Sequence, residues 1–115
     1  MLSETRSAIY NMCKTVNIPV YDYWVVDATF PYIITSSMDT VDTYLKVNDQ
    51  TDYIFEIHIF DKNVGKKTVI DIIDQLRVAY ISLDGIGKTF NQIVLDDKEP
   101  NVVHGIVTLR FTKYE

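Results

Sequence analysis

The chain has 115 residues and a mass of 13.3 kDa, the size of one ordinary domain with a real hydrophobic core. Hydrophobic residues make up 47% and charged residues 23%, so the composition excludes a disordered chain, a collagen-like repeat and a disulfide scaffold. The net charge of −5 argues against binding to nucleic acid phosphates or to an anionic membrane surface, because both require clustered Lys and Arg.

The first expected element is a helix over about residues 4–16, with Ser3 as a suitable N-cap. The apolar side chains that recur at helical spacing are Ile9, Met12, Cys13 and Val16. The helix should end before Pro19, because the residue that precedes a proline avoids the α region. The N-terminus has no basic segment followed by an apolar one, so we expect an intracellular chain.

Two β-rich segments are expected next, at residues 20–23 and 32–37. Pro31 precedes the second segment, a position that a strand tolerates, and the isomer of the Phe30–Pro31 bond is left open. The aromatic side chains around these segments are Tyr21, Tyr23, Trp24, Phe30 and Tyr32. They form either an exposed binding patch or a seam of the core.

Residues 38–52 are polar over a length that a small compact domain does not otherwise need. We predict a polar loop or a long hairpin arm that contacts a neighbouring copy or a partner. The residues proposed for this contact are Asp39, Asp42, Tyr44, Lys46 and Asp49. The carboxylates lack the central Gly of a calcium loop, so no metal site is predicted here.

The clearest strand is expected over residues 53–60. Alternate side chains point to opposite faces of a strand, so one face carries Phe55, Ile57 and Ile59 and the other carries Ile54, Glu56, His58 and Phe60. Asn63 is a candidate cap for a second helix over about residues 65–80. The apolar stripe of that helix consists of Val69, Ile72, Ile73, Leu76 and Tyr80.

A turn at Asp84-Gly85 precedes two final strands, residues 89–95 and 102–114, which an exposed loop at 96–101 connects. The order is helix, strands, helix, strands. This order predicts one α+β domain over residues 1–115, a mainly antiparallel β-sheet with two α-helices packed on one face.

No motif predicts a catalytic centre, a metal site or a cofactor. His58 and His104 have no second ligand at metal spacing and are interpreted as structural. Cys13 is interpreted as a buried, reduced thiol, since a reactive one would need a basic neighbour. The segment Gly85–Thr89 ends like a phosphate loop, but it lacks the first Gly and leads into a strand rather than a helix.

A pattern of short segments extends in order along almost the whole chain. The segments are residues 27–34 with Phe30-Pro31-Tyr32, 55–60, 65–67, 69–76, 83–85 and 103–111. This pattern resembles the tail terminator proteins (also called tail completion or minor tail proteins) of long-tailed, siphovirus-type bacteriophages and prophages. Residues 38–52 carry no signature of that family.

The resemblance implies an α+β protein without enzymatic activity that forms a ring, commonly a hexamer, on the finished tail tube. The ring would end tube polymerisation and form the head–tail joining interface, so the implied partners are further copies, the tail tube protein and the head-side connector protein. The implied location is the host bacterial cytoplasm during assembly and then the head-proximal end of the virion tail.

Two pairs of charged residues complete the proposed contact set. Lys66 and Lys67 fall at the start of the second helix, where the helix dipole disfavours positive charge. They indicate either an acidic surface on a neighbouring subunit or simply a solvated helix start. Asp96 and Asp97 belong to the expected exposed loop.

Two other classes of function stay open. One is a small cytosolic adaptor that binds a partner peptide by strand addition at a sheet edge. The other is a small enzyme that uses acidic residues in a cleft, against which the dispersal of the carboxylates counts. A ring on tail tubes would separate the virion protein from both.

Overall fold

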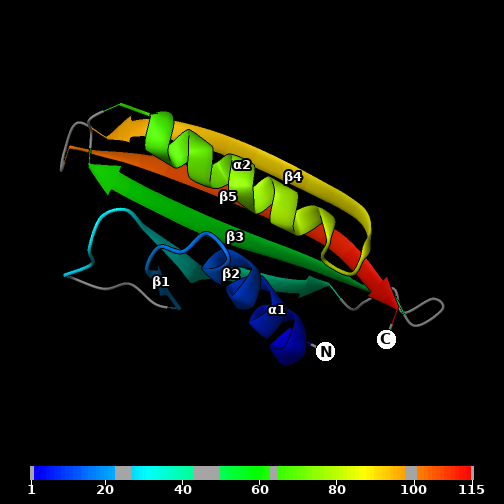
Figure 1. Cartoon of the computed structure of the whole chain (residues 1–115). Coiled ribbons are helices and arrows are strands. Elements are labelled where there is room, and N and C mark those ends of the chain that lie inside the picture. Colours follow the sequence, from blue (N-terminus) through cyan, green and yellow to red (C-terminus); the bar gives the residue numbers. More distant parts are fainter. Residues whose placement is uncertain (1, 23–26, 43–49, 63–64, 98–100, 115) are drawn as a thin grey trace.

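The computed structural model describes residues 2–22, 27–42, 50–62, 65–97 and 101–114 (Figure 1). The elements, in chain order, are α1 (Leu2–Lys14), β1 (Val20–Tyr21), β2 (Tyr32–Asp42), β3 (Gln50–Lys62), α2 (Lys67–Ile81), β4 (Ile86–Asp97) and β5 (Val102–Tyr114). The structure is elongated along its strands, with extents of 48 × 25 × 23 Å.

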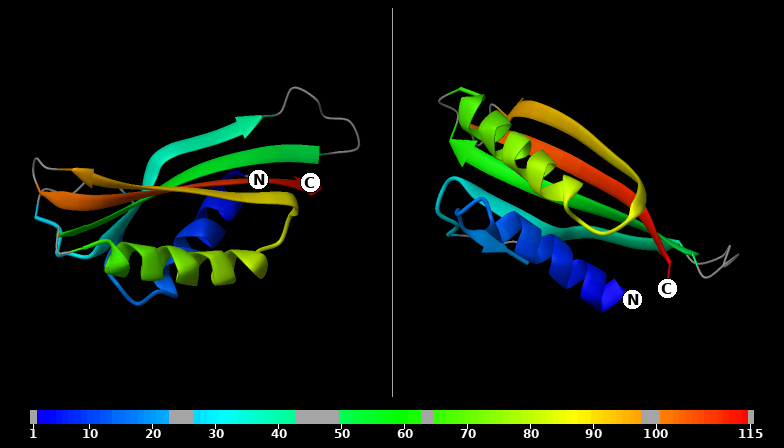
Figure 2. Two further views of the ribbon diagram at one scale, coloured as in Figure 1. Left: turned by 90° about the horizontal axis from the view of Figure 1, so that it is seen from above. Right: turned by 45° about the vertical axis from the view of Figure 1, so that its right-hand side comes forward.

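The strands form one five-stranded sheet in the order β1-β2-β3-β5-β4. All neighbouring pairs are antiparallel except the short parallel pair β1–β2. Both helices lie on the same face of the sheet, beneath it in the left view of Figure 2. The predicted fold class, a mainly antiparallel sheet with two helices on one face, is therefore confirmed.

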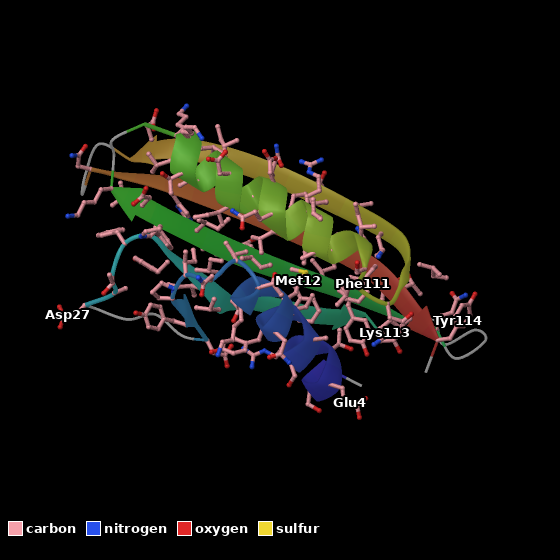
Figure 3. The ribbon with its side chains drawn as sticks, in the orientation of Figure 1. Glu4, Met12, Asp27, Phe111, Lys113 and Tyr114 are labelled. Carbon is pink, nitrogen blue, oxygen red and sulfur yellow. The ribbon has the colours of Figure 1, made fainter. Side chains whose placement is uncertain are left out.

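The hydrophobic core lies between the helices and the sheet. Every residue of the two predicted helical stripes is buried, as are Phe55, Ile57 and Ile59 of β3. Figure 3 shows the contrast along α1: Met12 lies on the side of the sheet, whereas Glu4 is exposed. Period-3.6 patterns in the helices and period-2 patterns in the strands thus direct apolar side chains to one shared layer.

α2 is held on the sheet by close packing and by polar contacts at its C-terminal end. Gly105 of β5 leaves room for the helix, because a Cβ at that position would lie 2.7 Å from Cγ1 of Val69. The Lys88 ammonium donates hydrogen bonds to the carbonyl oxygens of Tyr80, Ile81 and Leu83 at 2.9, 2.8 and 2.6 Å. These carbonyls lie at the end of the helix, where a cation is favoured.

Several predicted boundaries were wrong. α1 begins at Leu2, so Ser3 lies inside the helix rather than at its N-cap. The N-cap of α2 is Lys66, without a side-chain cap, and Asn63 lies outside the described residues. β2 extends to Asp42 and β4 reaches from Ile86 to Asp97, beyond the predicted ends, because paired neighbouring strands complete their backbone hydrogen bonds. Asp96 and Asp97 therefore belong to a strand and not to a loop.

Two questions left open by the sequence have answers in the structure. The Phe30–Pro31 peptide bond is cis. The described aromatic side chains Tyr21, Phe30 and Tyr32 pack as a partly buried group against Ile34, Phe60 and Val102, a small cluster separate from the main core. Tyr23 and Trp24 lie outside the described residues.

Candidate assembly surface

β4 is the last strand of the sheet, and it offers one free edge. It pairs with β5 on one side, and no strand in the described ranges pairs with its other side. α2 lies over the covered face of β4, where Arg77 hydrogen-bonds to Gln92 and stacks on Phe90 at 4.8 Å from the ring centroid. The helix thus holds β4 from one face and leaves its outer edge accessible.

The outer edge of Thr89–Leu95, here called the β4 edge, follows directly after a register shift between Ile86 and Thr89. Its register with β5 is continuous, and its seven residues include no charge, no Pro and no Gly. On the sheet face that no helix covers, Ile93 is 56% and Leu95 is 42% exposed. Edge strands of natural proteins normally carry charges, prolines or bulges that prevent pairing with another chain. Lys88 and Asp96 flank the segment but do not interrupt it.

The opposite side of the sheet has a second partly open edge. β1 pairs only with Ile33 and Ile34 of β2. β2 continues from Thr35 to Asp42, and along that length no described strand pairs with its outer side. Its inner side pairs with β3 after a register shift between Ile34 and Met38.

The contact residues predicted from the sequence do not gather in one place. Asp39 lies opposite Phe55 near the middle of β3, and Asp42 lies opposite Asp52 toward one end of the sheet. Asp96 and Asp97 lie at the other end, opposite Val103 and Val102 of β5. Tyr44, Lys46 and Asp49 lie outside the described residues.

Lys66 and Lys67 have acidic partners within the chain. The ammonium of Lys66 lies 3.3 Å from a carboxylate oxygen of Asp96, which links the start of α2 to the end of β4. Lys67 donates a 2.7 Å hydrogen bond to Asp71 one turn along the helix. The hydrogen bond that Lys67 donates to Asp71 is the main reason that the pKa of Lys67 is raised. These ion pairs provide a reason within the chain for two lysines at a helix start.

A chain of polar side chains lies on the uncovered face of the sheet. Nε2 of His58 is 2.6 Å from a carboxylate oxygen of Glu56, and Nδ1 of His58 is 2.6 Å from Nε2 of His104. A neutral imidazole donates through one nitrogen and accepts through the other. The Glu56 carboxylate accepts from Nε2 of His58, and the tautomers decide which of the two facing histidine nitrogens donates. The His104 ring stacks on Phe60 at 4.3 Å between centroids.

Sequence reasoning missed both the histidine contact and the free strand edge. His58 and His104 are 46 residues apart, and only the β3–β5 register brings them together. The sequence signal for the β4 edge is the uncharged run at 89–95, but strand order decides whether such a run is an edge.

Cys13 is fully buried, and this burial raises the pKa of its thiol to about 12, which keeps it protonated and unreactive. Within the described ranges, no three His, Cys, Asp or Glu side chains are grouped so that they could hold a metal ion. Among the same residues, neither helix is long and apolar enough to cross a membrane.

No family model matches the sequence, and no curated protein matches it. Among solved structures, the fold is similar to that of a chain in the virion of a native gene transfer agent particle, with a TM-score of 0.65. The two sequences are 14% identical, and the similarity covers 93% of this chain and 92% of the other. At this identity the likeness is one of fold, and it extends over nearly the full length of both chains.

Proposed function

We propose that this protein is a structural component of a phage-like virion that caps the tail tube as a ring. In this role it ends tube polymerisation and forms the joint between tail and head, without catalysis. The observation that carries the proposal is the near full-length likeness of fold to a chain of a virion particle. The tail-terminator-like order of sequence segments supports the specific position at the end of the tail.

Three further observations agree with an assembly role. The protonated thiol of Cys13 is buried and so offers no nucleophile. The β4 edge offers backbone groups for pairing with another chain. The net charge of −5 disfavours retention of DNA that passes through the ring.

The direct test combines purified protein with tail tubes assembled from the tube protein of the same phage or prophage genome. We expect rings at one end of the tubes by negative-stain microscopy and a narrow distribution of tube lengths. A deletion of residues 42–49, within the proposed arm at 38–52, should remove the control of tube length while the core stays folded. Tubes that grow without limit in the presence of excess folded protein would overturn the proposal.

The β4 edge also favours a second candidate, an adaptor that binds a partner peptide by strand addition. The same purified protein distinguishes the two functions. An adaptor would bind an extended peptide as a monomer and would not bind tail tubes. A tail terminator would be a monomer or weak oligomer alone and would assemble into a ring only when tail tubes are added.

A further inference from the structure

The β4 edge has the features of a strand that takes up a partner strand. Its seven residues are uncharged and free of Pro and Gly, and Thr89, Phe90, Ile93 and Val94 are β-branched or aromatic residues that favour strands. Ile93 and Leu95 add exposed apolar area next to the unpaired backbone groups. Such an edge is prone to uncontrolled association unless a specific strand covers it.

We propose that the β4 edge of one copy pairs with the outer edge of β2, from Ser36 to Asp42, of the next copy. The occupant is therefore a second copy of this chain, and the joint repeats around the ring. This inference rests on the proposed function, because it states how the ring is held together.

The two open edges lie on opposite sides of one sheet, which favours a head-to-tail joint. β4 ends the sheet on one side, and β2 follows only the two-residue β1 on the other. Contact between two different edges is heterologous, and such contacts generate rings when the rotation between copies closes. A joint between two β4 edges would be isologous and would stop at a dimer.

The strand directions fit this joint. From β2 to β3, β5 and β4 the direction reverses at each step, so β4 runs opposite to β2. A neighbouring copy that continues the sheet in the same sense therefore places its β2 antiparallel to β4. Antiparallel pairing is the more stable arrangement per residue.

Charge also favours β4 as the strand that is covered. A chain with a net charge of −5 repels its own copies, and the repulsion is least where the contact itself carries no charge. The β4 edge itself adds no charge over seven residues, so it places no second charge beside Asp39 and Asp42 of β2. Asp96 lies outside the edge and is already paired with Lys66.

Cross-linking on tail tubes tests the joint directly. Two variants are made in a Cys13→Ser background, Asn91→Cys in β4 and Thr40→Cys in β2, and they are joined with a short bismaleimide. We expect cross-linked dimers only when the two variants are mixed, and a ladder up to the closed ring from the chain that carries both cysteines. Cross-links from Asn91→Cys alone, or none from the mixture on capped tubes, would overturn the β4–β2 joint.

Matched charge variants separate this joint from the proposed function. Ile93→Lys adds a charge beside the β4 edge, and Val78→Lys adds the same charge on the exposed side of α2. Both side chains are exposed, so both variants should fold, but only Ile93→Lys should lose the ring. If Ile93→Lys still forms rings on tubes, the β4–β2 joint is wrong and the capping function stands. If the unmodified protein does not cap tubes, both the β4–β2 joint and the capping function are wrong.

Discussion

The two faces of the sheet differ in how they are built and in what removing a side chain from them should do. The covered face joins Phe55, Ile57 and Ile59 of β3 to both helices in one continuous core. Among the described residues, the uncovered face carries a small buried cluster of Ile34, Phe60 and Val102, followed by polar side chains. Most buried side chains of the described residues therefore lie on the covered face, whereas Ile93 and Leu95 on the other face are exposed.

The strongest test of this comparison is a cavity on the covered face. Leu76→Ala removes a fully buried side chain of α2 and should lower the free energy of unfolding by about 2–5 kcal/mol. Val78→Ala, two residues away and 68% exposed, should change it by less than about 0.5 kcal/mol. Urea denaturation of both variants gives the two values, and similar losses from both would contradict the comparison.

A methyl group at Gly105 should give the next largest effect. Its Cβ would lie 2.7 Å from Cγ1 of Val69 and 3.2 Å from Cδ1 of Ile73, so α2 must shift. Gly105→Ala should therefore cost about 1–3 kcal/mol. Val69→Ala makes room for the new methyl, and the double variant should lose less than the sum of the two single losses. Additive losses would show that Gly105 does not set the distance between helix and sheet.

The histidine contact tests how much the uncovered face contributes. His104→Phe keeps a ring to stack on Phe60 but removes the nitrogen that lies 2.6 Å from Nδ1 of His58. The expected loss is about 0.5–1.5 kcal/mol, the net value of one hydrogen bond. The control is Ile106→Val, on the same strand and face. A loss as large as that of Leu76→Ala would show that this face is a second core.

The titration of the Cys13 thiol should have no effect on the free energy of unfolding at neutral pH, but it should lower that free energy at alkaline pH. Its folded-state pKa of about 12 lies above the ordinary value of 9.0, so the folded protein retains a proton that the unfolded chain releases. The stabilisation from this thiol is complete below pH 9 and decreases as the pH rises toward 12. Thiol labelling at pH 8 should therefore require unfolding. Rapid labelling of the native protein, at a rate independent of stability, would contradict the burial of Cys13.

Periodicity in the sequence predicts the helices and the strand whose apolar side chains form the core. The helical stripes and the alternation in β3 depend on local spacing, and all of these side chains are buried as expected. For the polar end of β2, by contrast, the sequence predicts either a loop or a long hairpin, because Asp39 and Asp42 disfavour strands locally. Pairing with Phe55 and Asp52 overrides that preference.

The sequence predicts less of the candidate assembly surface than of the core. The uncharged run at 89–95 is visible in the sequence, but its exposure follows from strand order, which local patterns do not determine. The partners of Lys66 and His58 are likewise set by contacts between segments distant in sequence. The proposed role of the segment at 38–52 as an arm stays a prediction.

The β3–β5 register has a consequence for the time course of folding. It pairs Gln50 with Tyr114, residues 64 apart, so the central strand of the sheet acquires its main partner last. A ribosome adds about 5–20 residues per second, so β3 waits for roughly 3–13 seconds after its own synthesis begins. Non-local pairing of this kind also folds slowly, on the order of milliseconds to seconds. Nascent chains should therefore need shielding by chaperones until residue 114 has left the ribosome.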